Sequence, residues 1–171
     1  AKAKRWVEWT LTHKREDGYL GPIPFPEPPE PEPGLQRGKR RDWWPKMVML
    51  KALKQHYMAT GDERVVEALT RYFRFQLQEL PKTPLGHWTF WGNRRGADNL
   101  LIVYWLSNIT GDSFLLELGD LIHSQTHPYT EIFLERGDIA IEGPFNEKQW
   151  TAKDATAYPF HCVNLAQGMK A

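Results

Sequence analysis

The sequence has 171 residues, enough for one ordinary domain, and its 22 Lys and Arg residues against 21 Asp and Glu residues give a net charge of +1. That balance argues against nucleic acid as the main partner, and no apolar run approaches the roughly 20 residues that a membrane-spanning helix needs. The single cysteine, Cys162, excludes an internal disulfide and a zinc site built from several cysteines of this chain.

The N-terminal part predicts one helix followed by a long connection. Residues 2–14 place two tryptophans on one side of a helix that ends near Gly18. No apolar signal core precedes this helix, so the N-terminus resembles a helix entered partway, as in a trimmed chain. Residues 21–41 are rich in proline and then basic, which predicts an extended surface connection within one domain of residues 1–171. The alternative is a proline-motif ligand for another domain.

The next helix is the best defined of the sequence. Asp42 is a suitable N-cap for a helix over residues 43–60, and Gly61 fits the left-handed residue that follows it. Pro45 falls in the first turn, where a missing N–H costs nothing. A further helix over residues 62–80 carries a broad apolar face, so we expect it to be covered on more than one side.

The second half of the sequence predicts shorter elements. An aromatic segment over residues 85–92 is too brief and too rich in glycine at its ends for a helix. Periodicity and end signals predict helices over about 97–110, 113–125, 129–136 and 158–169, with an irregular stretch over 137–157.

A repeat connects these elements. Thr60-Gly61-Asp62 recurs as Thr110-Gly111-Asp112, fifty positions later, and each copy stands between two amphipathic helices. A helix–turn–helix unit with this period predicts an all-α fold of stacked antiparallel helical hairpins. The alternative is that the two copies share only their turn chemistry, because Thr-Gly-Asp is a natural junction between a C-cap and an N-cap.

Aromatic residues and carboxylates are the candidate binding groups. Eight tryptophans are many for this length, and they either fill the core or offer indole faces to a sugar, whose C–H faces are apolar and whose rim carries hydroxyl groups. Asp42 lies beside Trp43 and Trp44 at the start of a helix, and Asp98 lies at the start of another. Each carboxylate could instead be a helix cap.

The sequence offers no complete metal or nucleophile site. His123 and His127 have the spacing of a zinc pair, but Pro128 indicates that the helix has already ended there. His161 and Cys162 are neighbours on a predicted helix and point in different directions, so we interpret Cys162 as a small buried apolar residue. The catalytic residues therefore stay unknown, and we expect no metal ligand in this chain.

Three stretches carry a resemblance to a known family. They are Glu16-Asp17-Gly18-Tyr19-Leu20, residues 42–65 and residues 161–168, and together they span most of the sequence. The sequence resembles the N-terminal part of the bacterial β-L-arabinofuranosidase-like proteins, glycoside hydrolase family 127 and its relatives. The resemblance implies an (α/α)6 barrel as the catalytic domain. Six hairpins with a period of fifty residues need roughly 300 residues, so this sequence would form a partial toroid of about half a barrel.

The resemblance also implies a zinc-bound cysteine as nucleophile, with a glutamate and further cysteines as zinc ligands in later motifs that include a Cys-Cys pair. No Cys-Cys pair occurs here, so we expect no cofactor in this chain and zinc only in a complete family protein. By the same resemblance, His161 matches a family histidine that lines the sugar pocket. The family's matching histidine at the start of the fourth helix is not evident in this sequence, and Asp98-Asn99 stands near that place.

We therefore predict part of a glycoside hydrolase that acts on terminal L-arabinofuranose or a similar sugar in plant polysaccharides or glycans, and that does not hydrolyse it alone. The predicted substrate-binding residues are Asp42, Trp43, Trp44, Trp91, Asp98 and His161, with Trp88 nearby. The partners would be a carbohydrate and either a second copy or the missing barrel half, without nucleic acid or membrane. The alternatives are a non-catalytic helical-repeat interaction module and a self-standing sugar-binding domain.

Overall fold

The structure is a computed structural model that describes residues 2–21, 41–130 and 162–168. Its helices are α1 (Lys2–Thr12), α2 (Trp44–Thr60), α3 (Arg64–Glu79), α4 (Phe90–Arg94), α5 (Gly96–Thr110), α6 (Phe114–Gln125) and α8 (Cys162–Gly168). These described ranges contain no strand, which confirms the all-α prediction. The predicted proline-rich connection, the irregular stretch over 137–157 and nearly all of the helix expected over 129–136 lie outside the described residues.

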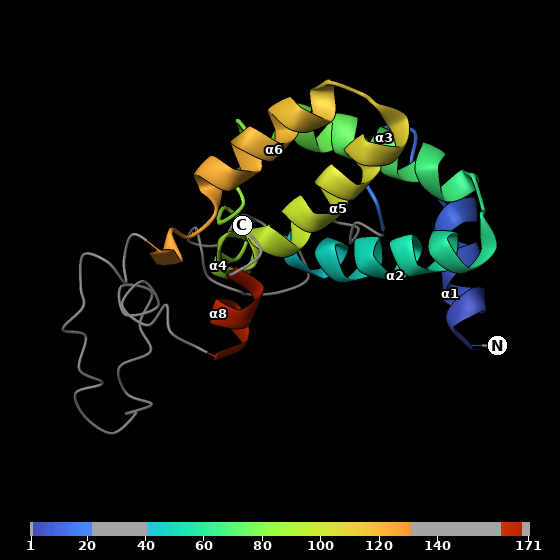
Figure 1. The fold of residues 1–171 in the computed structure, drawn as a ribbon, viewed down its shortest axis with the longest axis horizontal. Helices are drawn as coiled ribbons and strands as arrows, with labels where there is room; N and C mark the ends of the chain where they lie inside the picture. Colours follow the sequence, from blue (N-terminus) through green and yellow to red (C-terminus); the bar gives the residue numbers. More distant parts are fainter. Residues whose placement is uncertain (1, 22–40, 131–161, 169–171) are drawn as a thin grey trace.

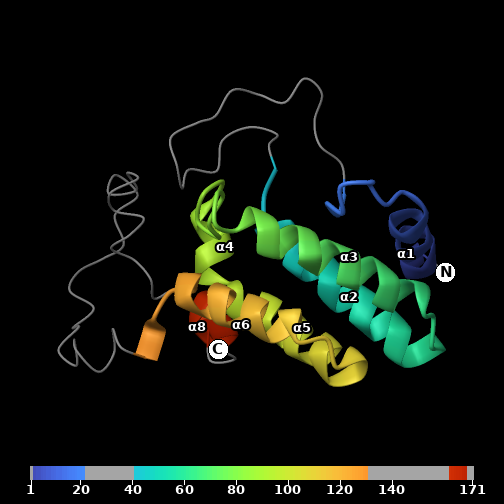
Figure 2. The same cartoon turned by 90° about the horizontal axis from the view of Figure 1, so that it is seen from above.

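The helices form two layers of antiparallel hairpins. Helices α2 and α5 run in the same direction and contact each other, and α3 and α6 return in the opposite direction beside them (Figures 1 and 2). Helix α1 packs against both α2 and α3, and α8 packs against α5. This arrangement confirms the predicted pairing of α2 with α3 and of α5 with α6.

Both hairpins turn at the repeated Thr-Gly-Asp tripeptide. Gly61 and Gly111 adopt left-handed conformations with φ angles of 67° and 72°. Their N–H groups donate hydrogen bonds to the carbonyl groups of Tyr57 (2.7 Å) and Ser107 (2.8 Å), so each turn satisfies an open carbonyl at the end of its helix. The shared Thr-Gly-Asp chemistry thus sets where the first helix of each hairpin ends and the chain turns back.

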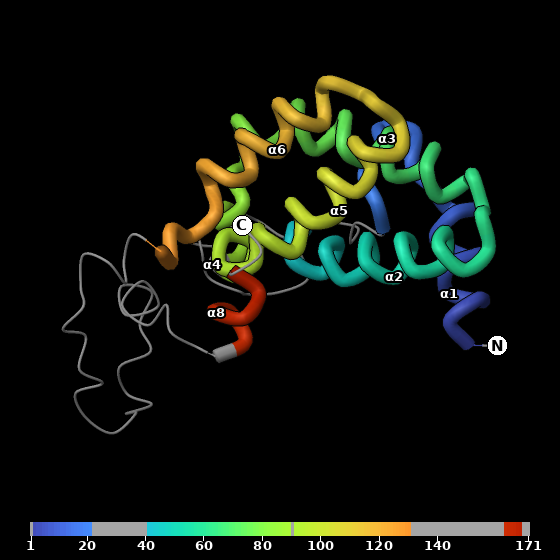
Figure 3. Tube along the Cα trace, in the orientation of Figure 1, coloured from blue at the N-terminus to red at the C-terminus, as the bar shows by residue number. Residues whose placement is uncertain are grey.

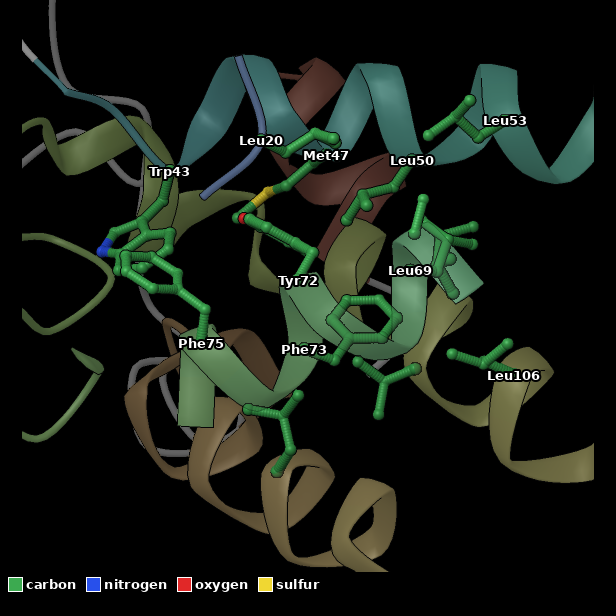
Figure 4. Packing of buried hydrophobic residues seen from close by; sticks show 14 of the residues in the cluster. Leu20, Trp43, Met47, Leu50, Leu53, Leu69, Tyr72, Phe73, Phe75 and Leu106 are labelled. Carbon is green, nitrogen blue, oxygen red and sulfur yellow. The ribbon is translucent and has the colours of Figure 1, made fainter. Parts of the chain in front are cut away.

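The core lies between the two layers (Figure 4). Met47, Leu50 and Leu53 of α2 face Leu69 and the aromatic residues of α3, and all of these side chains are buried. Helix α3 is covered by α2, α5, α6 and α1, as its broad apolar face predicted.

Helix α4 is a correction to the sequence prediction, which left residues 85–92 without a helix. Gly92 lies inside α4 and does not end it. A Cβ atom at Gly92 would approach the Leu85 carbonyl oxygen to 2.1 Å, so this glycine permits a close approach between the helix and the preceding loop.

Candidate functional site

The N-terminal ends of α2 and α5 lie at the same end of the molecule, next to α4 and α8 (Figure 3). Asp42 precedes α2, and its Oδ1 atom accepts hydrogen bonds from the backbone N–H of Trp44 (3.0 Å) and from Oγ1 of Thr89 (2.9 Å). The N-cap of α2 is Trp43, without a side-chain cap hydrogen bond, so the prediction of Asp42 as N-cap was wrong by one residue. The first of these bonds instead closes a turn just before the helix. Burial raises the pKa of the Asp42 carboxyl, and these two hydrogen bonds oppose that shift.

Trp43 lies in the core, where its indole ring cannot stack on a ligand as predicted. Its side chain is 0% exposed, and its indole N–H donates to the Thr83 carbonyl oxygen (2.9 Å). Its ring lies 4.9 Å from that of Trp88 and 6.2 Å from that of Phe75, measured between centroids. Trp43 is therefore a core residue that fixes the start of α2, and Trp88 is buried with it.

Trp44, Trp91 and Arg95 form a compact group that we call the indole–guanidinium cluster. The two indole centroids are 5.8 Å apart, and Cζ of Arg95 lies 4.6 Å from the Trp44 ring and 4.9 Å from the Trp91 ring. Both distances are within the range of a cation–π interaction. Nε of Arg95 donates to Oδ1 of Asn164 on α8 (3.1 Å). The cluster and Asn164 thus join three parts of the sequence, at residues 44, 91–95 and 164.

Asp98 lies in the first turn of α5, where a negative charge is favourable, and it is only 3% exposed. Its Oδ1 atom is 2.6 Å from Nζ of Lys51 on α2. This ion pair connects the two parallel helices beside the indole–guanidinium cluster. Burial lowers the pKa of the Arg95 guanidinium and the Asp98 carboxylate opposes that shift, so Arg95 stays charged at neutral pH.

His161 lies outside the described residues, so its predicted convergence with Trp43 and Trp44 stays a prediction. The structure brings Trp44 and Trp91 together, and the charge of Asp98 interacts with that of Arg95 in the same cluster. Sequence analysis did not identify Lys51, Arg95 or Asn164. Only the position of Arg95 shortly after Trp91 could have indicated it, because its other contacts depend on residues that are distant in the sequence.

A cavity of about 340 Å³ lies beyond the end of α6. It is lined by His123, Ser124, Thr126, His127, Pro128, Tyr129, Thr130 and Gly168. Helix α6 ends at Gln125, so His127 lies beyond the helix, as Pro128 indicated. Nδ1 of His127 contacts the buried Arg94 guanidinium, and the Tyr129 hydroxyl donates to the Arg94 carbonyl oxygen (3.2 Å).

Two further findings concern only the residues that the structure describes. They contain no group of three or more His, Cys, Asp or Glu side chains that could hold a metal ion. No helix among them is long and apolar enough to cross a membrane.

The fold places the chain among all-helical domains built from stacked antiparallel hairpins. A family model for the beta-L-arabinofuranosidase GH127 catalytic domain matches residues 1–158. The chain belongs to this family, whose catalytic domain is an α/α barrel. Comparisons with curated proteins and with solved structures found no match.

Proposed function

We propose that this chain binds the terminal sugar of a substrate as part of a glycoside hydrolase, and that the sugar is L-arabinofuranose or a similar one in plant polysaccharides or glycans. Membership of the GH127 family supports the reaction class. The observation that carries the binding proposal is the pair of half-buried indoles, Trp44 and Trp91, 5.8 Å apart at one end of α2 and α5.

The chemistry of the cluster suits a sugar. Indole faces pack against the apolar C–H face of a sugar ring, and nearby charged groups bind its hydroxyl groups. Arg95 supplies such a group next to the indoles, and Asp98, which is paired with Lys51, interacts with the charge of Arg95. Asp42 and Trp43 serve this site by fixing the start of α2, and His161 remains part of the proposal through its match to the family histidine.

The described residues do not fit the zinc site that the family resemblance implies, because they contain no group of three candidate ligands. We therefore assign no catalytic step to them. A route through two carboxylates would need a pair about 5–10 Å apart on either side of the scissile bond, and the two acids of the site, Asp42 and Asp98, are each bound to other groups.

Calorimetric titration with methyl β-L-arabinofuranoside tests the binding proposal. We expect Trp44→Ala to weaken binding about tenfold or more, because it removes one stacking face and the contact that holds Arg95. Trp6→Ala is the matched control, because Trp6 is 66% exposed on α1 and belongs to no part of the cluster.

Thermal unfolding of both variants separates a loss of binding from a loss of folding. If the intact chain binds no arabinofuranoside, or if Trp6→Ala weakens binding as much as Trp44→Ala does, the proposal is wrong. A folded chain without sugar affinity would favour a helical-repeat interaction module.

A further inference from the structure

We propose that the cavity beyond the end of α6 is a second carbohydrate site, which takes one neutral sugar unit through its hydroxyl groups. The inference goes beyond the proposed function, because this cavity is lined by other residues than Trp44 and Trp91 and needs no stacking on their indoles. It follows from the size of the cavity, from its uncharged wall and from two buried polar atoms nearby that have no hydrogen-bond partner.

The cavity lies at the same end of the molecule as the indole–guanidinium cluster. Helices α4 and α8 and the end of α6 come together there (Figures 1 and 2). Arg94 contacts His127 of the cavity wall, whereas the next residue, Arg95, belongs to the cluster. The volume of about 340 Å³ is at the lower end of the range for small-molecule sites, so the cavity suits a single sugar ring.

The described wall of the cavity contains no aspartate, glutamate, lysine or arginine. Burial and the charge of Arg94 lower the pKa of His127 to about 4, and burial raises the pKa of Tyr129 to about 12, so both side chains are uncharged at neutral pH. Threonine and serine hydroxyl groups complete the polar part of the wall. Such a wall offers an ion no opposite charge, whereas it can exchange hydrogen bonds with the hydroxyl groups of a sugar.

His127 brings a buried donor that has no acceptor. Its Nδ1 atom accepts a hydrogen bond from the Arg94 guanidinium, so the proton of the neutral ring is on Nε2. This Nε2 atom is buried and has no hydrogen-bond partner within the described residues. Because an unpaired buried donor is unfavourable, an acceptor that enters the cavity and reaches Nε2 would be stabilised.

Gln167 on α8 brings a buried acceptor that has no donor. Its Oε1 atom also lacks a hydrogen-bond partner in the described part of the chain. Gln167 directly precedes Gly168 of the cavity wall and is three residues after Asn164, so its side chain leaves α8 on the face that meets Arg95. A hydroxyl group can both accept from an imidazole N–H and donate to an amide oxygen, whereas a carboxylate can only accept. The two unpaired atoms therefore favour a ligand with hydroxyl groups.

The test observes His127 and not the tryptophans. Its imidazole C–H signals can be followed by NMR at neutral pH during titration with methyl β-L-arabinofuranoside and assigned by single His→Gln changes. We expect these signals to shift and to saturate. The compound 2-methoxytetrahydrofuran has the same ring and methoxy group without the hydroxyl groups, and inorganic phosphate is a compact anion. Neither should shift the signals of His127.

Two variants test the cavity itself. Thr130→Phe should weaken this binding about tenfold or more, because the phenyl ring fills part of the cavity. Thr60→Phe is the matched control, because Thr60 is an exposed threonine at the far end of α2. Gln167→Leu should weaken binding about fivefold without lowering the midpoint of thermal unfolding, since it removes a buried polar atom that has no partner in the described part of the free chain.

If Trp44 and Trp91 respond to the sugar and His127 does not, the inference is overturned and the proposed function stands. The reverse pattern supports the inference and overturns the terminal-sugar site, and no response of either group overturns both. Shifts of His127 with phosphate or with 2-methoxytetrahydrofuran that equal those with the sugar also overturn the inference. So do equal affinities in Thr60→Phe and in a folded Thr130→Phe chain.

Discussion

His127 is held neutral by its surroundings. Arginine can only donate hydrogen bonds, so the contact between Arg94 and Nδ1 of His127 requires that nitrogen to be unprotonated. Burial and the positive charge of Arg94 lower the pKa of His127 from 6.5 to about 4. Protonating His127 would bring two cations together beside the cavity at the end of α6.

This shift predicts a loss of stability in acid. The unfolded chain takes up a proton on this histidine near pH 6.5, and the folded chain does so only near pH 4. The contribution of His127 to the free energy of unfolding is therefore fully present above about pH 6.5 and is lost as the pH falls toward about 4. We expect a loss of about 1–2 kcal/mol between these limits, after allowance for partial solvent screening.

Urea unfolding at pH 7.5 and at pH 5 measures this effect. His127→Gln should lose less stability on acidification than the unchanged chain, because glutamine still accepts a hydrogen bond and does not titrate. His123→Gln changes an exposed histidine of α6 and should behave like the unchanged chain. Identical acid losses in the unchanged chain and in His127→Gln would contradict the account.

The sequence indicated the right region for the site without identifying every residue of it. Trp43 and Trp44 are adjacent, and one is fully buried whereas the other contacts Trp91 and Arg95. Successive helical positions point about 100° apart, so only the rotation of α2 against its neighbours decides which indole enters the core. The contact between Arg95 and Asn164 joins residues 69 positions apart, and no local pattern indicates it.

At the scale of elements, Gly61 and Gly111 provide a matched pair. Both have left-handed φ angles, and a Cβ atom at either position would meet nothing within 4 Å. Gly61→Ala and Gly111→Ala should therefore each lower the free energy of unfolding by about 1 kcal/mol, because an alanine is strained in the left-handed conformation but collides with no other atom. Gly92→Ala should cost more, because its Cβ atom would collide with the Leu85 carbonyl oxygen.

Chemical denaturation of the three variants checks this ranking. A destabilisation by Gly92→Ala no larger than that of the two turn variants would contradict the packing role of Gly92. Unequal costs at Gly61 and Gly111 would show that the two hairpins do not share the same turn energetics.

The helices that the sequence predicted correctly are those whose apolar face and end residues can both be recognised in the sequence. Helices α2, α3, α5 and α6 have regular apolar faces and a glycine or proline at their ends, and their observed bounds differ from the predicted ones by one or two residues. Helix α4 was missed because Gly92 resembles a helix stop in the sequence, whereas in the structure it permits close packing against Leu85. A glycine needed for a tertiary contact looks the same in sequence as one needed for a turn.

At the scale of the whole molecule, several large apolar side chains remain exposed. They are Trp6, Trp9, Val48, Met58, Leu101, Tyr104, Ile109, Leu116 and Val163. Trp6 and Trp9 lie on α1, which is at one edge of the helix layers (Figures 1 and 2). That residues 1–171 form about half of a barrel stays a prediction. A partial barrel would leave apolar faces that the missing helices cover, so this prediction requires exposed apolar side chains at an edge.

We expect the chain to self-associate through this edge. Sedimentation over a range of concentrations should show an increasing mass, and the double change Trp6→Ser with Trp9→Ser should reduce the increase because it removes exposed apolar area. Leu116→Ser, on α6 away from α1, is the control and should leave association unchanged. A chain that stays monomeric at every concentration would contradict this prediction.

The most direct test of the sugar-binding account observes the tryptophans themselves. The indole N–H signals of the chain can be followed by NMR during titration with methyl β-L-arabinofuranoside and assigned by single Trp→Phe changes. The account predicts that the signals of Trp44 and Trp91 shift together with one affinity, that Trp43, buried and bound to the Thr83 carbonyl, shifts little, and that the exposed Trp6 does not shift. Shifts confined to Trp6 and Trp9, or no shift of Trp44 and Trp91 at saturating sugar, would contradict it.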